Sequence, residues 1–196
     1  MAETAREFSM RALCLSLCLC FVAGCGGTSA QKGTPASPVV WHRLGETVQC
    51  GDLSVTLDKV TVGTIRIQVS KDYAAPFEGN PAMTCAWLTV KNSSATKKYD
   101  YPGWPRSQLL EPNEPTIMTD EFGNDYRPYP RMAEIAPVEG ASGDSEIYPG
   151  KEIIDTVLFK PPVDAARTLR IQLSGSTVGL AAPICFEIPR SAIIEN

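Results

Sequence analysis

The chain is expected to fold as an all-β protein, a sandwich of two antiparallel sheets. Apolar and polar residues alternate in several short stretches, which is typical of strands that bury one face. Turn-forming residues separate these stretches, and no run of a dozen residues carries a clean helical period. A parallel α/β fold needs a crossover helix between its strands, so that class is disfavoured. Seven or more short strands within about 155 residues favour a two-sheet sandwich.

Five of the predicted strands are stretches whose apolar positions are expected to face the core. In chain order these positions are Leu53, Val55 and Leu57; Ile65, Ile67 and Val69; Ala86, Leu88 and Val90; Leu169, Ile171 and Leu173; and Ile184, Phe186 and Ile188. Glycine, asparagine, aspartate and proline favour turns, because they supply positive φ, local hydrogen bonds or a missing N–H group. Four segments of that kind are expected to connect strands: Cys50-Gly51-Asp52, Phe122-Gly123-Asn124-Asp125, Tyr148-Pro149-Gly150 and Lys160-Pro161-Pro162.

Strand and turn motifs follow one another in a recognisable order. They are Gly45-Glu46-Thr47-Val48 with Gly51-Asp52-Leu53-Ser54-Val55, then Leu88-Thr89-Val90-Lys91-Asn92-Ser93-Ser94, Asp120-Glu121-Phe122-Gly123-Asn124-Asp125-Tyr126, Tyr148-Pro149-Gly150-Lys151 and Val157-Leu158-Phe159-Lys160-Pro161-Pro162. This order resembles a bacterial immunoglobulin-like family, a domain of unknown function with a telokin-like fold that recurs in secreted proteins and lipoproteins. The resemblance spans roughly Trp41 to Ile188, and a long insertion at Ile67 to Met83 and an aromatic loop at Tyr99 to Arg106 depart from it. It implies an immunoglobulin-like β-sandwich and attaches no catalytic residue to the chain.

Residues 1–24 are expected to form a signal peptide. Arg11 is followed by twelve residues that are apolar except for Ser16. A spanning helix needs about 20 apolar residues, whereas a secretory signal needs a shorter apolar stretch after a basic start. Met10 and Arg11 open such a signal cleanly, which leaves both Met1 and Met10 as candidate initiators.

Val22-Ala23-Gly24-Cys25 resembles the bacterial lipobox, in which the cysteine is lipidated on its thiol and becomes the mature N-terminus. From Gly26 to Pro38, nine of thirteen residues are Gly, Pro, Ser or Thr, so residues 25–38 are expected to be the lipidated cysteine and a flexible linker. The alternative, a buried apolar segment with a chance cysteine, conflicts with the glycines that follow Cys25. The sequence therefore predicts a domain at residues 39–196, anchored to a membrane of the cell envelope on its extracytoplasmic side.

Charge and histidine content limit the function classes. Lys and Arg number 18 against 22 Asp and Glu, a net charge of −4, which lacks the basic excess that nucleic-acid phosphates require. The one histidine, His42, lies near the linker, and neither a zinc-binding helix motif nor a phosphate-loop motif is present. We expect that the protein is not an enzyme, binds no cofactor and has no nucleic-acid partner.

The leading hypothesis is a domain that binds a protein or a cell-envelope component. One alternative is an envelope hydrolase that uses loop carboxylates, and the other is a structural spacer without a specific ligand. The carboxylates in question are Asp120, Glu121, Asp144 and Glu146. A hydrolytic pair of acids cannot be distinguished from solvated loop acids by sequence.

Two loops that interleave aromatic residues, prolines and arginines are the candidate binding surface. Tyrosine, tryptophan and arginine dominate contact energies at binding surfaces. The alternative is that the rings fill the open end of the sandwich. The candidate residues are Tyr99, Tyr101, Trp104, Arg106, Tyr126, Arg127, Tyr129 and Arg131.

The oxygen-bearing residues around Gly123 offer a calcium site as another interpretation. Asp120, Asn124 and Asp125 could supply oxygen ligands, of which calcium needs six to eight. A hairpin turn uses the same residue types and is far commoner, so no metal site is expected.

Three cysteines remain after the signal peptide, and the exported compartment is often oxidising. Cys85 and Cys185 each precede a core residue near the start of a predicted strand, so both are expected to point off the core face. If the two strands run in the same direction, the two sulfurs lie at one end, and a Cys85–Cys185 disulfide is predicted. Cys50 is expected to be a free, buried thiol. Three separate buried thiols are the alternative.

Overall fold

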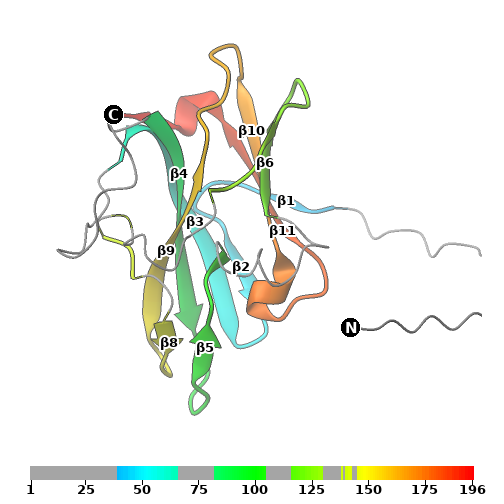
Figure 1. Cartoon of the computed structure of the whole chain (residues 1–196). Coiled ribbons are helices and arrows are strands. Elements are labelled where there is room, and N and C mark those ends of the chain that lie inside the picture. Colours follow the sequence, from blue (N-terminus) through cyan, green and yellow to red (C-terminus); the bar gives the residue numbers. More distant parts are fainter. Residues whose placement is uncertain (1–38, 66–81, 105–115, 130–137, 139, 143–144) are drawn as a thin grey trace, which may run out of the picture. The chain divides into compact units, whose positions relative to one another are not determined.

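The predicted strands pair into two main sheets in the computed structural model (Figure 1). The structure describes residues 39–65, 82–104, 116–129, 138, 140–142 and 145–196, and Pro38–Asn196 group as one compact unit. Several predictions lie outside the described residues: the signal peptide at 1–24, Cys25 and the linker at 25–38, the strand positions Ile67 and Val69, and the side chains of Arg106, Arg131 and Asp144.

The first sheet has five strands in the order β1-β11-β10-β6-β7. Their bounds are β1 Trp41–His42, β6 Ile117–Asp120, β7 Asp125–Tyr126, β10 Thr168–Leu173 and β11 Ile184–Pro189. Neighbouring strands are antiparallel except β1 and β11, which pair in parallel over two residues.

The second sheet has the order β12-β3-β4-β9, and β2 also pairs with β3. Its strands are β2 Thr47–Cys50, β3 Leu53–Thr64, β4 Ala82–Asn92, β9 Glu152–Phe159 and β12 Ile194–Glu195. The pairs are antiparallel except for the short parallel pair of β12 with β3. The predicted position Ile65 follows the end of β3, which continues as one strand through Thr64.

Three shorter pieces complete the described structure. Strands β5 (Tyr99–Tyr101) and β8 (Ser145–Ile147) form a separate antiparallel pair, and two 3₁₀ helices cover Gly175–Val178 (η1) and Arg190–Ala192 (η2). Within the described part of the chain, no helix is long and apolar enough to cross a bilayer.

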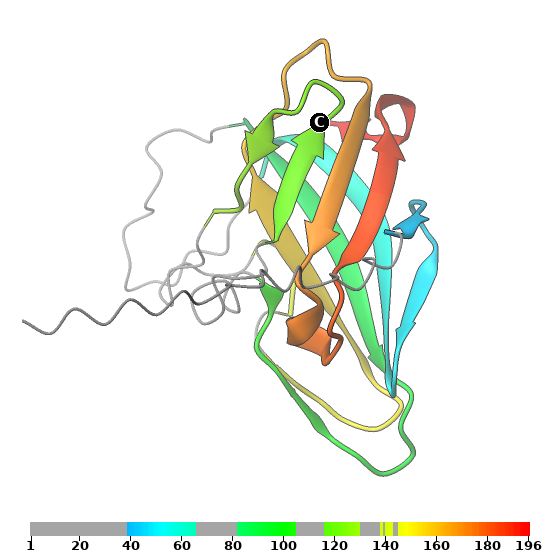
Figure 2. The same ribbon diagram turned by 90° about the vertical axis from the view of Figure 1, so that its right-hand side faces the viewer.

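The two main sheets bury one common core, and this confirms the predicted antiparallel β-sandwich. In Figure 2 the green, orange and red strands of the first sheet lie in front of the cyan, green and gold strands of the second. The predicted apolar positions of β3, β4, β10 and β11 all belong to this core, and none is more than 4% exposed. The four predicted turn segments lie at strand ends, and Gly51, Gly123 and Gly150 adopt positive φ there. Alternation and turn chemistry thus predicted these strands correctly.

The predicted Cys85–Cys185 disulfide is wrong, because Cys50, Cys85 and Cys185 are all free, buried thiols. Cys85 lies in β4 of the second sheet, and Cys185 lies in β11 of the first. Each side chain points off the core face, as predicted, so the two sulfurs lie on opposite outer faces of the sandwich. Packed sheets are about 10 Å apart, whereas a disulfide needs Cα atoms within about 7 Å.

The free thiols are poor nucleophiles. Burial raises the pKa of Cys85 to about 12 and that of Cys50 to about 11, and it also raises the pKa of Cys185. Thiol chemistry requires the thiolate, so these cysteines stay protonated and unreactive at neutral pH. Cys50 belongs to the core cluster, as its alternation with Val48 predicted.

Candidate binding surface

Two of the predicted contact residues, Tyr101 and Trp104, lie inside the domain around a buried acid. Trp104 is fully buried, and Tyr101 and Asp155 of β9 are 3% and 1% exposed. The Tyr101 hydroxyl donates to Asp155 Oδ2 at 2.8 Å, and the Trp104 backbone N–H donates to the same oxygen at 3.2 Å. The two rings pack edge to face with centroids 5.7 Å apart. They fill the sandwich, so the prediction that they form a contact surface is wrong.

A third predicted contact residue, Tyr126, is also buried, because its hydroxyl fastens the β6–β7 turn. That hydroxyl donates to Asp120 Oδ2 at 2.8 Å and accepts the Val163 backbone N–H at 3.1 Å. Asp120 also accepts the backbone N–H groups of Phe122 and Asn124, each at 3.0 Å, and the Asn124 side-chain amide at 2.8 Å. Tyr126 therefore joins two loops and is not available to a partner.

Asp120 organises the β6–β7 turn, which agrees with the hairpin interpretation of this segment. Burial raises the pKa of its carboxyl group, but the hydrogen bonds from Asn124, Tyr126 and Phe122 outweigh that effect and lower the pKa overall. Both carboxylate oxygens thus face N–H and O–H donors. Among the described residues, no group of three or more His, Cys, Asp or Glu side chains could hold a metal ion.

The described acids of the hydrolase hypothesis do not converge. Glu121 accepts the backbone N–H groups of Arg167 at 2.7 Å and Thr168 at 3.2 Å, next to the turn that Asp120 organises. Glu146 belongs to β8, at the opposite end of the domain from that turn in both ribbon views (Figures 1 and 2). Each of the three acids already accepts structural hydrogen bonds, so the structure does not bring these three together as a catalytic pair.

The two predicted aromatic loops also lie apart from each other. Arg127 is exposed and Tyr129 is half-buried, and the Tyr129 backbone N–H donates to Leu158 O of β9 at 2.8 Å. Tyr99 lies in β5, at the other end of the domain from β6 (Figure 1). The structure therefore does not bring the predicted residues together as one surface.

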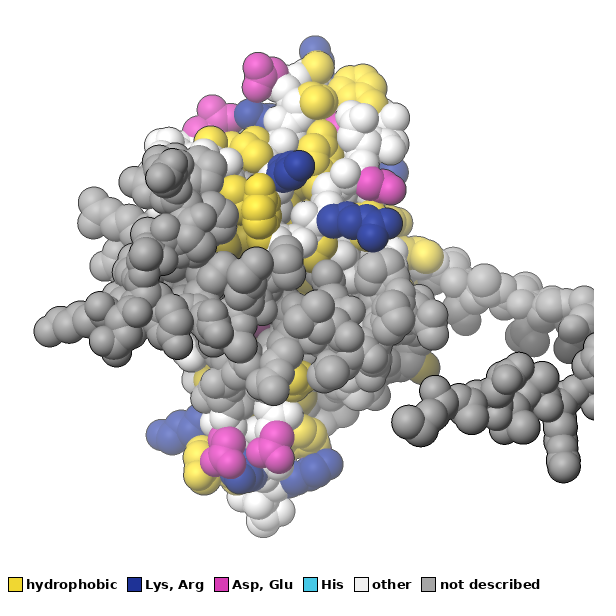
Figure 3. Space-filling view, viewed as in Figure 1, with side chains coloured by type: hydrophobic (Ala, Val, Ile, Leu, Met, Phe, Trp, Pro, Cys, Tyr) yellow, Lys and Arg dark blue, Asp and Glu magenta, His cyan; other side chains and the backbone are white. Residues whose placement is uncertain are grey.

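An exposed surface does occur on the β5–β8 pair, on the side opposite to the buried tyrosines. Alternation along the two strands turns Tyr101 and Ile147 inward and leaves Lys98, Asp100, Glu146 and Tyr148 outside; we call these four residues the ribbon face. Tyr148 is 56% exposed. Figure 3 shows acidic, basic and hydrophobic side chains together at this end of the domain.

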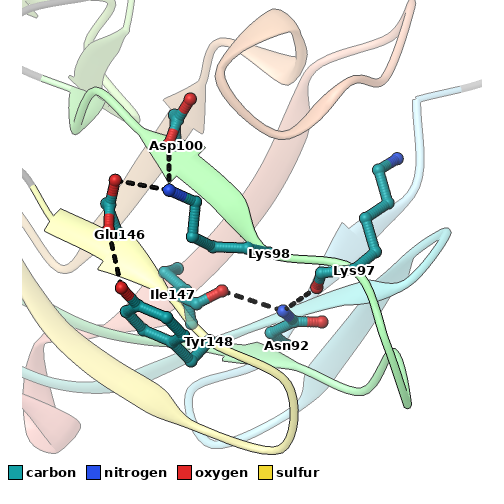
Figure 4. Close-up of polar contacts among 7 residues, drawn as sticks. All are labelled: Asn92, Lys97, Lys98, Asp100, Glu146, Ile147 and Tyr148. Atoms are coloured by element: carbon teal, nitrogen blue, oxygen red, sulfur yellow. Dashed lines mark hydrogen bonds and ion pairs between the residues drawn. The ribbon is translucent and has the colours of Figure 1, made fainter.

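The side chains of the ribbon face are connected to one another (Figure 4). Lys98 Nζ lies 2.5 Å from Glu146 Oε1 and 3.7 Å from Asp100 Oδ1. The Tyr148 hydroxyl donates to Glu146 Oε2 at 3.0 Å, and Lys98 Nζ lies 5.9 Å from the centre of the Tyr148 ring. An ammonium, two carboxylates and a tyrosine ring are thus held in one arrangement.

The electrostatics of the ribbon face keep its ion pair charged. The hydrogen bond to Glu146 raises the pKa of Lys98, and the hydrogen bonds from Lys98 and Tyr148 lower the pKa of Glu146. Exposed ion pairs contribute little to stability, so this pair adds little to the free energy of folding.

The buried side chain of Asn92, at the end of β4, holds the β5–β8 pair in place. Its side-chain amide donates to the carbonyl oxygens of Lys97 at 2.7 Å and Ile147 at 2.9 Å (Figure 4). Its Oδ1 atom accepts the Ser94 N–H at 2.9 Å. The Tyr99 hydroxyl adds a bond to Asp52 Oδ2 at 2.9 Å. Of the predicted contact residues, Tyr99 thus supports the ribbon from its inner side.

Sequence reasoning missed Tyr148 and Asn92. Tyr148 stands in a Tyr-Pro-Gly segment, whose turn chemistry gives no sign of an exposed contact residue. The alternation Lys98-Tyr99-Asp100-Tyr101 was an available signal, because it marks a strand whose even positions face outward.

Comparisons with known proteins give distant structural likenesses. No protein-family model and no curated protein matches the chain. An uncharacterized β-sandwich protein from Clostridium difficile 630 is similar with a TM-score of 0.46 and 11% identity, over 79% of this chain and 97% of that one. The secreted protein MPT63 of Mycobacterium tuberculosis is similar with a TM-score of 0.41 and 11% identity, over 79% of this chain and 99% of that one. The yjhA protein of Bacillus subtilis is similar with a TM-score of 0.43 and 15% identity, over 76% of this chain and 98% of that one.

Proposed function

We propose that the protein is a non-enzymatic binding module of the cell envelope, anchored by lipid on Cys25, and that its ribbon face binds a protein or another envelope component. The observation that carries this proposal is the 56% exposed Tyr148 ring, fixed by Glu146 beside Lys98. Tyrosine supplies a large contact area at low entropic cost, and a preorganised surface loses little freedom on binding.

The arrangement of the described acids favours this function over hydrolysis. Asp120 fastens the β6–β7 turn, Glu121 accepts backbone N–H groups at the start of β10, and Glu146 belongs to the ribbon face. General acid and base catalysis needs two groups within reach of one substrate bond. The ribbon face offers recognition groups, whereas a spacer would need no such exposed, fixed aromatic ring.

Photocrosslinking at position 148 is expected to capture a partner in intact cells. A p-benzoylphenylalanine at 148 should give one discrete adduct, because the partner packs on that ring. The reverse-charge substitution Glu146→Lys should reduce the adduct about tenfold, since like charges would then face the partner's complementary groups. The matched control is the same photocrosslinker at Phe122, which is 61% exposed on the β6–β7 turn. Equal, unspecific labelling from both positions would support the spacer instead.

Cys25→Ser is expected to release the protein from membranes. The substitution removes the thiol that would carry the acyl chains, and no spanning helix is expected from the sequence to replace them. Cell fractionation should find the wild type with membranes and the variant in the soluble fraction. Cys50→Ser is the matched control, because that cysteine lies in the core. A variant that stays with membranes to the wild-type extent would show that Cys25 is not the anchor.

A further inference from the structure

Three consecutive apolar residues are exposed where the described domain begins. Val39, Val40 and Trp41 are 58%, 64% and 40% exposed. Single exposed apolar side chains are normal on a protein surface, but a run of three is unusual unless something covers it. The run lies immediately after the linker of the sequence.

Strand β1 fixes the direction in which Trp41 points. Trp41 is paired with Cys185 and His42 with Phe186 of β11. His42 packs on Phe186 at the core side, with ring centroids 6.0 Å apart, so alternation places Trp41 on the outer face of the sheet. The Arg170 guanidinium lies 5.4 Å from the centre of the Trp41 ring and holds it there.

An open groove of about 680 Å³ lies beside Trp41. Trp41, His42 and Arg43 line one part of it, and Thr168, Glu187 and Pro189 of β10 and β11 line another. A guanidinium, an imidazole and a hydroxyl group can donate to a phosphate, and a carboxylate can pair with an ammonium group. The groove thus sets phosphate-binding groups next to Trp41 of the exposed apolar run, and its carboxylate, Glu187, is paired with Arg170 at 2.8 Å.

We propose that Val39–Trp41 contacts a phospholipid bilayer and that the neighbouring groove faces its headgroups. This inference rests on the proposed lipid anchor at Cys25. Tryptophan favours the membrane–water interface, since its ring is apolar and its N–H group is polar. An apolar run next to charged groups suits an interface at which acyl chains give way to headgroups.

The length of the linker selects the bilayer as the occupant. Thirteen residues separate Cys25 from Val39, and a flexible chain of that length spans on the order of 20 Å. A bilayer that held the lipid on Cys25 would therefore be within reach of Val39. Such tethering gives a millimolar-range effective concentration, at which even a weak contact is populated.

Quenching by brominated lipid tests the contact directly. The lipidated full-length protein is reconstituted into vesicles of phosphatidylethanolamine and phosphatidylglycerol, in which part of the lipid carries bromine on the upper acyl chain. Trp104 is fully buried and Trp87 is half-buried, so Trp41 is the most exposed of the three tryptophans. We expect brominated vesicles to quench about a third of the tryptophan emission, and vesicles without bromine to shift the Trp41 emission to the blue, because the ring enters the interface. Trp41→Phe should abolish the bromine-dependent loss.

A double substitution in the apolar run and two further samples test whether the bilayer or a second copy of the chain covers Trp41. Val39→Ser with Val40→Ser should reduce the quenching severalfold while the protein still sediments with vesicles. Equal quenching of wild type and Trp41→Phe in vesicle-bound, lipidated protein would overturn the contact and leave the anchor intact. A protein mass without acyl chains would overturn the anchor and the contact together. In lipid-free Cys25→Ser, a Trp41 emission shift that depends on protein concentration would overturn the bilayer in favour of a second copy.

Discussion

Trp104→Ala is expected to lower the free energy of unfolding by about 3–5 kcal/mol, because truncation of a buried tryptophan leaves a large cavity. Trp104 is among the largest fully buried side chains of the domain. Its indole N–H donates to the Ser174 carbonyl oxygen at 3.0 Å, so alanine also leaves that buried oxygen without its donor. Urea denaturation should show a lower midpoint with an unchanged slope.

Two matched substitutions test whether burial causes this loss. Trp104→Phe keeps an aromatic ring but removes the N–H group, so it should cost less than Trp104→Ala. Trp41→Ala removes a 40% exposed ring and should cost no more than about 1 kcal/mol, as truncations near the surface usually do. If Trp104→Ala were as mild as Trp41→Ala, the buried position of Trp104 would be refuted.

The strands of the sandwich could be predicted because their signal is local. In β10, Leu169, Ile171 and Leu173 alternate with polar residues, and all three lie in the core. Positive φ at Gly123 and Gly150 likewise follows from residue type, because glycine tolerates that conformation without strain. Alternation and turn chemistry act over a few residues, so a single sequence carries them.

The inward position of the aromatic loop agrees with the alternative that the sequence left open, and the sequence could not decide for it because the loop's partner is an exception to the core pattern. In β9, Ile153, Asp155 and Val157 pair opposite the core positions of β4, so Asp155 faces the interior. A carboxylate at a core position needs donors, and Tyr101 and Trp104 supply them from 51 to 54 residues away. Nothing local in the loop shows that its rings will turn inward toward such a group.

The disulfide prediction failed for a related reason. The side on which Cys85 and Cys185 point follows from alternation and was predicted correctly. The sheet to which each strand belongs depends on pairing between distant segments, β4 with β3 and β9, and β11 with β10 and β1. The side on which a side chain points depends on neighbouring residues in the strand, whereas the sheet to which the strand belongs depends on residues far away in the sequence.

Asp155→Ala is expected to cost about 3–5 kcal/mol of unfolding free energy, a loss typical of removing one partner from a buried, charged network. The carboxylate accepts the Tyr101 hydroxyl, the Trp104 N–H and, at 2.7 Å, the Thr156 N–H. Alanine would leave these donors in the core without this acceptor, and each buried unsatisfied donor costs about 1–3 kcal/mol. The measurement is again the urea midpoint, with near-ultraviolet circular dichroism to follow the packing of the Tyr101 and Trp104 rings.

Conservative variants separate the lost acceptor from the lost volume. Asp155→Asn keeps one acceptor oxygen and nearly the same shape, so its unfolding free energy should lie between those of the wild type and Asp155→Ala. Tyr101→Phe removes the hydroxyl donor and keeps the ring. The double variant Tyr101→Phe with Asp155→Ala should lose less unfolding free energy than the sum of the two single variants, by about 1 kcal/mol or more, because the interaction they share is lost only once. Asp164→Ala, at an exposed acid in the loop between β9 and β10, is the matched control and should be nearly neutral. Additive losses at Tyr101 and Asp155, or a loss at Asp155 no larger than that at Asp164, would contradict the role of Asp155 as the acceptor that draws the aromatic loop into the core.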